Sequence, residues 1–142
     1  AEDTDKASVK VVEDFWTKLG CIVQVMDPGE HDRIFADISH VPHAVAAALI
    51  NANDAQTLQA AGKGFMDTSR IASGPANIWA DVFLTNAENV GAGIDRVIEQ
   101  LDNLKRIIGS GDREKLEQTL EKARQKRAAM INFKMKKKEL IS

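Results

Sequence analysis

Apolar side chains recur every three or four residues along most of this chain, which is the spacing that places them on one face of a helix. The first such run lies between about residue 4 and residue 18, and Gly20 is expected to end it. Its apolar positions are Val9, Val12, Phe15, Trp16 and Leu19. One short helix is therefore predicted at the start of the chain.

The pattern changes at Cys21–Met26, which is apolar and rich in β-branched residues and is followed by Asp27-Pro28-Gly29, a turn sequence. This segment is the only strand that the sequence predicts. A single strand cannot satisfy its own backbone hydrogen-bonding groups. Its partners are therefore expected outside this chain or in another chain.

Helical periodicity returns after Gly29 and continues to the end, so the fold class is predicted to be all-α. Two Gly and an Asp-Thr-Ser cluster favour a loop over Gly62–Arg70. The helices are predicted over about Glu30–Asn51, about Asp54–Ala61, from Pro75 to about Ile108, and from Asp112 to about Lys138.

The length and apolar stripe of the longest predicted helix indicate that the chain binds a protein partner. Ile94, Val97, Leu101, Leu104 and Ile108 follow heptad-like spacing on it. A helix of about 34 residues is roughly 50 Å long and would project beyond a compact chain of this size, about 35 to 40 Å across. A homodimer would cover the projecting stripe. The alternative is a break at Gly91-Ala-Gly93 that lets two shorter helices fold back.

Composition narrows the possible partners and location. The net charge is -2 and aromatic content is 5% without Tyr, which argues against nucleic acid. The acidic N-terminus has no apolar signal region, and no stretch is expected to reach the roughly 20 apolar residues of a membrane span. A cytoplasmic protein is predicted, with the single Cys21 expected as a buried structural thiol rather than a reactive one.

Nucleotide-binding and hydrolytic motifs are missing from the sequence. The steps Gly62-Lys-Gly64 and Gly91-Ala-Gly93 lack the third Gly of a dinucleotide fingerprint, and neither follows a predicted strand. There is also no Walker loop, no Gly-x-Ser-x-Gly elbow and no His-Glu-x-x-His. On its own, the chain therefore has no complete active-site signature.

The segment Ser39-His40-Val41-Pro42-His43 is the first candidate site. Residues three apart share a helix face, so both imidazoles should point the same way. Pro42 would leave the carbonyl of Ile38 without its usual donor and bend the axis. Three interpretations stay open: two ordinary histidines, a substrate pocket, or a metal site that recruits His31, Asp32 and Asp37 without a recognised ligand spacing.

Arg70 is the second candidate, because its guanidinium offers a planar fork to a carboxylate. The alternative is a structural ion pair with Asp67. Trp79, about one turn into the next predicted helix, is either a core residue or a wall of the same pocket.

Taken together, these elements resemble the C-terminal helical region of prephenate dehydrogenases, including their arogenate and cyclohexadienyl relatives. Nearly the whole chain is covered, and the Gly-Phe-x-Asp-Thr-x-Arg element is the most specific part. The matching elements are His31-Asp32, Ser39-His-x-Pro-His43, Gly64-Phe-x-Asp-Thr-Ser-Arg-Ile-Ala72, Ile78-Trp79 and Asn86.

The resemblance implies a division of the chain. Residues 1–28 look like the last helix and strand of the family's nucleotide-binding domain, and residues 29–142 like its helical substrate-binding and dimerisation domain. The implied reaction is oxidative decarboxylation of prephenate or arogenate with NAD or NADP on the route to tyrosine. In the family, the cofactor loop and the His that polarises the ring hydroxyl lie in the nucleotide-binding domain, so this chain alone is expected to be inactive.

Site roles follow from the same resemblance. Arg70 would bind a substrate carboxylate, and His43 and His40 would line the pocket. Asp67 and Trp79 would support or gate it, and His31 would be a secondary or interdomain residue. Met66 stands where many relatives have Arg, which leaves the choice between prephenate and arogenate open. The competing hypothesis is a non-catalytic helical dimer that binds a carboxylate ligand or regulates a partner.

Overall fold

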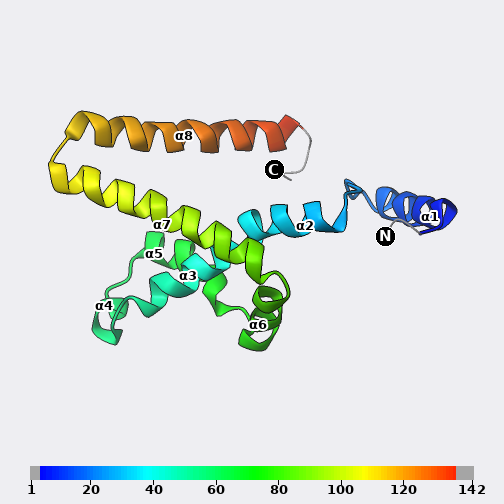
Figure 1. The fold of residues 1–142 in the computed structure, drawn as a ribbon, viewed down its shortest axis with the longest axis horizontal. Coiled ribbons are helices and arrows are strands. Elements are labelled where there is room, and N and C mark those ends of the chain that lie inside the picture. The colour runs from blue at the N-terminus through cyan, green and yellow to red at the C-terminus, as the bar shows by residue number, and fades with distance from the viewer. Residues whose placement is uncertain (1–3, 137–142) are drawn as a thin grey trace. The chain divides into compact units, whose positions relative to one another are not determined.

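The structure is a computed structural model and describes residues 4–136. Every regular element in that range is helical, which confirms the all-α prediction (Figure 1). The chain divides into two compact units, one made of residues 1–25 and 99–142 and the other of residues 26–98. The candidate site residues all lie in the second unit.

Helix α1, Lys6–Lys18, agrees with the predicted first helix. Asp5 caps it by accepting a hydrogen bond from the backbone N–H of Ser8 at 2.9 Å. Gly20 follows with a φ of 85°, a left-handed conformation that glycine adopts without steric cost. The aromatic side chains Phe15 and Trp16 are 56% and 48% exposed.

The predicted strand over Cys21–Met26 is not formed among the described residues, which have no regular secondary structure between Cys21 and Asp27. A strand needs a neighbouring strand for its backbone groups, and residues 4–136 supply none. Cys21 is consequently exposed, so the expectation of a buried thiol was wrong for this chain.

A continuous helical stretch runs from Pro28 to Asn51. It starts with α2, Pro28–Phe35, where the Asp27 carboxylate accepts from the backbone N–H groups of Gly29 and Glu30 at 2.8 and 3.2 Å. It continues through the π-helical turn η1, Ala36–His40, into α3, Val41–Asn51. The sequence predicted a bend in the helix at Pro42. The irregularity in the structure is the π-turn just before it, in which the backbone N–H of Val41 donates a hydrogen bond to the carbonyl of Ala36.

By length and composition alone, Pro28–Asn51 could cross a membrane, with a mean hydropathy of 1.2. The expectation that no stretch reaches this length was therefore wrong. Within its unit, α3 contacts α5 and the short 3₁₀-helix η2, and its residues Val41, His43 and Ala46 are buried. These contacts identify α3 as the central helix of a packed helical cluster.

The predicted loop over Gly62–Arg70 is instead mostly helical. Helix α5 spans Lys63–Ser69 and η2 spans Arg70–Ser73. Thr68 and Ser69 donate their hydroxyl hydrogens to the carbonyls of Gly64 and Phe65, one turn earlier, at 2.9 and 2.8 Å. These bonds let the two polar side chains remain inside a helix rather than compete with it.

The predicted long helix from Pro75 is divided, but not at Gly91 or Gly93. Helix α6, Ala76–Thr85, ends at Asn86, whose φ of -125° and ψ of 34° interrupt the helix, and α7 spans Ala87–Ser110. With 24 residues, α7 is about 36 Å long. The predicted helix of about 50 Å is therefore not formed, although apolar side chains on α7 are exposed.

Two further helices agree with the sequence. Helix α4, Ala55–Gln59, is capped by Asp54, which accepts from the N–H of Thr57 at 2.7 Å. Helix α8, Arg113–Lys136, follows a turn at Gly111, where φ is 68°, and Asp112 accepts from the N–H of Lys115 at 3.0 Å. The predicted end of this helix near Lys138 lies outside the described residues.

The unit that holds the site packs around small residues. Its buried apolar side chains are Ala36, Val41, Ala46 and Val90. At Gly93 on α7, an added Cβ would lie 2.5 Å from Cγ2 of Val41 and 3.1 Å from Oδ1 of Asp37. The absence of a side chain at this position allows α7 to approach the start of α3.

Replacing Gly93 tests this close approach. We predict that Gly93→Ala lowers the free energy of unfolding by about 1 to 3 kcal/mol, because the added methyl group forces neighbouring atoms apart. Gly91→Ala is the matched control, since nothing lies within 4 Å of the position that its Cβ would take. It should be neutral or stabilising by up to about 1 kcal/mol. Urea unfolding of both variants measures the difference, and equal effects would refute a close contact at Gly93.

Candidate functional site

His43 and Trp79 form the centre of the candidate site. The His43 ring, on α3, stacks on the indole of Trp79, on α6, with centroids 3.5 Å apart and planes 13° from parallel. Phe83, one turn after Trp79, meets both rings, at 6.0 Å from His43 and 5.7 Å from Trp79. An aromatic cluster thus joins α3 to α6.

His40 contacts the same indole. Its ring lies 6.4 Å from that of Trp79 at an angle of 80°, an edge-to-face arrangement. The prediction that His40 and His43 share one helix face is therefore confirmed, even though a π-turn ends between them. Asn86 lies on another side of His40, with its Nδ2 3.4 Å from Nδ1 of the ring.

His43 is buried, with 5% of its surface exposed, and its Nδ1 has no hydrogen-bond partner among residues 4–136. Burial lowers the pKa of the His43 imidazole below its ordinary value, because a charged ring would lose its hydration. The ring is therefore neutral near pH 7. A buried nitrogen without a protein partner marks a position where a ligand or water could supply one.

Gly74 permits the stacking of His43 on Trp79. A Cβ at this position would overlap Nε1 of Trp79, lie 2.8 Å from its Cδ1, and lie 3.0 Å from Cε1 of His43. Gly74 follows η2 directly, so it also links the stacked pair to the segment that begins at Arg70. Only a residue without a side chain fits there without moving the rings.

Arg70 begins η2, which packs against α3, the helix of His43. Its side chain is exposed and forms no ion pair or hydrogen bond within residues 4–136. Asp67 is also exposed, and the structural ion pair between the two that the sequence left open is not formed. The guanidinium fork of Arg70 is therefore available to an acceptor from outside these residues.

His31 has different neighbours from His40 and His43. It stacks on Phe35 with centroids 4.2 Å apart, and its Nδ1 lies 3.1 Å from Oδ1 of Asp32. Both side chains are about half exposed. Asp37, the other acidic residue of the metal hypothesis, pairs instead with Arg96. Within the described range no three His, Cys, Asp or Glu side chains are grouped to hold a metal ion, so the metal hypothesis gains no support.

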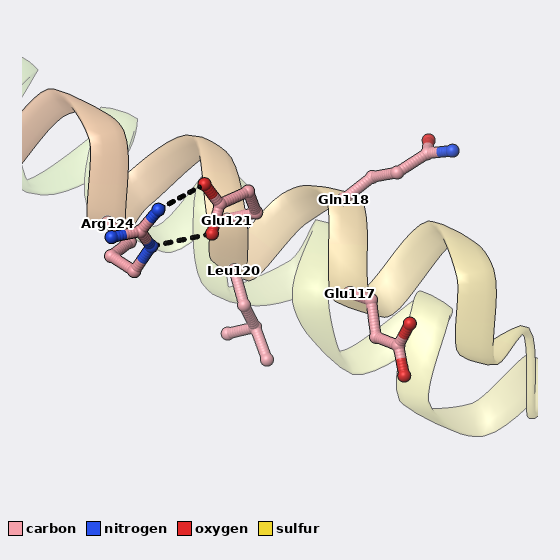
Figure 2. Close-up of a pocket in the computed structure, with 5 residues that line it drawn as sticks. All are labelled: Glu117, Gln118, Leu120, Glu121 and Arg124. Carbon is pink, nitrogen blue, oxygen red and sulfur yellow. Dashed lines mark hydrogen bonds and ion pairs between the residues drawn. The ribbon is translucent and has the colours of Figure 1, made fainter.

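A shallow, open concavity lies elsewhere, on α8 (Figure 2). Arg124 donates two hydrogen bonds there to the Glu121 carboxylate at 2.6 and 2.7 Å. These bonds, with one from Gln125, lower the pKa of Glu121 to about 2. All the lining residues come from this single helix, so the concavity has no second wall to enclose a substrate. They are Glu117, Gln118, Leu120, Glu121 and Arg124.

Sequence reasoning did not assign roles to Phe83, Gly74 or Asn86. Phe83 lies at helical spacing from Trp79, so the pattern alone could have placed it beside the indole. Gly74 precedes Pro75, and a Gly-Pro pair is typical of a turn, so the sequence did not indicate that Gly74 packs against the two rings. Asn86 lies in a largely apolar helical segment, and a polar residue in such a segment could have indicated a buried side chain that forms hydrogen bonds.

Comparison with known proteins decides the family. The family described as "Prephenate dehydrogenase, dimerization domain" matches residues 27–122. The chain belongs to this family. The match begins beside the predicted boundary at residue 28 and includes all three histidines, Arg70 and Trp79.

Individual relatives of this dehydrogenase family agree. Prephenate dehydrogenase of Bacillus subtilis (strain 168) is 31% identical over 121 residues, which are 81% of this chain and 33% of that protein. The crystal structure of prephenate dehydrogenase from Aquifex aeolicus with hydroxyphenyl propionate and NAD+ is 34% identical, with a TM-score of 0.84 over 92% of this chain and 48% of that one. Synechocystis arogenate dehydrogenase is 27% identical, with a TM-score of 0.78 over 92% and 50%. The chain thus spans between a third and a half of the length of these relatives.

The buried His43 predicts a pH dependence of stability. Because its pKa is lowered in the folded state, the unfolded chain takes up a proton first as the pH falls. The contribution of His43 to the free energy of unfolding should be complete above about pH 6.5 and decrease below it. His43→Gln should reduce this slope. Urea unfolding between about pH 7.5 and 5, at fixed protein concentration, measures the slopes; an unchanged slope in His43→Gln would contradict the assignment.

Proposed function

We propose that this chain is the C-terminal helical part of a prephenate or arogenate dehydrogenase, where it binds the substrate carboxylate and forms the dimer interface. The observation that carries the proposal is the family match over the residues that bring His40, His43 and Trp79 together. The ligand in the Aquifex aeolicus relative, hydroxyphenyl propionate, combines a ring with a carboxylate. These two features call for an aromatic wall and a cation.

The residues of this chain fit those two requirements. Trp79 and Phe83 present aromatic surface, and the free guanidinium of Arg70 can donate two parallel hydrogen bonds to a carboxylate. The neutral His43 can accept a hydrogen bond at its buried Nδ1. In this proposal Asp67 supports or gates the pocket, and His31 is a secondary or interdomain residue. The chain's part in catalysis is therefore to bind and orient the ring.

The described residues do not fit a nicotinamide cofactor. They contain no strand followed by a glycine-rich loop and helix, the arrangement that binds the pyrophosphate of NAD or NADP. NAD or NADP, which would accept the hydride, is therefore assigned to a nucleotide-binding domain outside this chain. Residues 1–28 would be the last part of that domain, and its contacts would cover the exposed side chains of α1.

Exposed apolar surface supports the dimer. On α7 and α8, several large apolar residues are at least half exposed: Ile98, Leu101, Ile108, Leu120, Met130 and Phe133. A second copy of the chain that packs on these helices would remove them from water.

Turnover tests the function. The polypeptide that joins this chain to its nucleotide-binding domain should oxidise prephenate or arogenate with NAD or NADP, and this chain alone should not. Lack of activity with both substrates and both cofactors would overturn the proposal. Turnover by the isolated chain would overturn the assignment of the cofactor to another domain. A cytoplasmic location remains a prediction.

Arg70→Lys tests the carboxylate site in the active enzyme. A point charge replaces a bidentate fork, so we predict that kcat/KM falls by about 30-fold, equivalent to about 2 kcal/mol. Arg127→Lys, at an exposed position on α8, is the control and should leave kcat/KM unchanged. Equal kinetics of Arg70→Lys and wild type would remove Arg70 from the substrate site.

Leu101→Glu tests the interface. Leu101 is 58% exposed in the single chain, and burying a leucine side chain against a partner contributes about 1.5 to 3 kcal/mol. We predict at least tenfold weaker self-association by sedimentation equilibrium. Gln100→Glu adds the same charge at the neighbouring exposed position without removing apolar surface, so it should have a smaller effect. Identical association of both variants would place the interface elsewhere.

A further inference from the structure

Asn86 is a buried residue that separates α6 from α7 and lies next to His40, a candidate pocket residue. It lies at the break between α6 and α7 and is 8% exposed. Its Nδ2 donates to the backbone carbonyl of Asp32 at 2.7 Å and lies 3.4 Å from Nδ1 of His40. Asn89 donates from its own Nδ2 to Oδ1 of Asn86 at 2.8 Å.

These neighbours determine which way the Asn86 amide points. A backbone carbonyl can only accept, so the amide nitrogen, not the oxygen, must face Asp32. The amide oxygen is occupied by the donor from Asn89. An amide nitrogen carries two hydrogens, and Asp32 uses one of them. The second is directed to Nδ1 of His40, which must therefore accept.

We propose that Asn86 is a positioning residue that holds neutral His40 as the tautomer with its proton on Nε2. A proton on Nδ1 would place two donors against each other, with no acceptor between them. The edge-to-face contact with Trp79 restricts the ring on a different side. Three groups from three segments, the Asp32 carbonyl, the Asn86 amide and the indole, thus define the state of His40.

The tautomer decides what His40 offers to a ligand. Its Nε2 forms no hydrogen bond within residues 4–136. With the proton on Nε2, this nitrogen is a donor, and the group opposite it must be an acceptor, such as a carboxylate or carbonyl oxygen. This consequence rests on the proposed function, whereas the tautomer itself does not.

Asn86→Asp tests the proposal by replacing a donor with an acceptor. An ionised carboxylate opposite Nδ1 favours a proton there, so the neutral ring should change to the Nδ1–H tautomer. Long-range ¹H–¹⁵N spectra of the labelled chain at about pH 8, where histidine is neutral, report both ring nitrogens separately. In the wild type Nδ1 should resonate as a non-protonated nitrogen and Nε2 as a protonated one. In Asn86→Asp the two chemical shifts should exchange places.

Controls separate this role from general structural effects. Asn77→Asp makes the same chemical change at an exposed position on α6 and should leave the His40 shifts unchanged. Asn86→Ala removes the donor without adding a charge, so the ring should become a mixture of tautomers. Circular dichroism verifies folding, and Asn86→Ala decides the question if Asn86→Asp does not fold. A wild-type ring protonated on Nδ1, or a tautomer that neither folded Asn86 variant changes, would overturn the proposal.

The same experiment is independent of enzyme activity, because the spectra need neither substrate nor cofactor. If the dehydrogenase assignment fails, turnover is absent while the predicted exchange of shifts is still observed. If the role of Asn86 fails, the shifts do not change while turnover is retained. The two failures are therefore distinguishable.

Discussion

The stacking of His43 on Trp79 is the contact on which the rest of the site depends. It joins α3 to α6 at a ring separation of 3.5 Å, and it buries an imidazole nitrogen without a protein partner. Gly74 must lack a side chain for the rings to meet, and the same segment begins with Arg70. One aromatic contact therefore forms a wall of the proposed pocket, favours a neutral His43, and connects both to Arg70, the proposed carboxylate-binding residue.

The scaffold around this contact is held by close approach of small residues rather than by a large apolar core. Ala36, Ala46 and Gly93 allow the helices to pack closely, and the described chain has no large side chain that is completely buried. Large apolar residues instead remain exposed on α1, α7 and α8. In the proposed function, a nucleotide-binding domain and a second copy of the chain cover these surfaces and add stability, which agrees with membership of a dimerization-domain family.

Sequence patterns predicted the helical fold, the start of the last helix after Asp112, and the shared face of His40 and His43, because each depends on local spacing or capping chemistry. They failed where tertiary contacts decide the local structure. Thr68 and Ser69 favoured a loop, but their hydroxyls bond to carbonyls one turn earlier and remain in α5. Asn86, not the glycines of α7, interrupts the long helix, since its side chain bonds the backbone of Asp32, 54 residues away. No local pattern contains that information.

A crystal structure of a polypeptide that joins this chain to a nucleotide-binding domain, with hydroxyphenyl propionate and NAD+ bound, would show whether the His43–Trp79 cluster and Arg70 form one carboxylate-binding pocket. We predict that the ligand carboxylate lies within hydrogen-bond distance of the Arg70 guanidinium and that the ligand ring lies beside the histidine and indole pair. A ligand bound elsewhere, with Arg70 pointing to solvent or paired with Asp67, would contradict it.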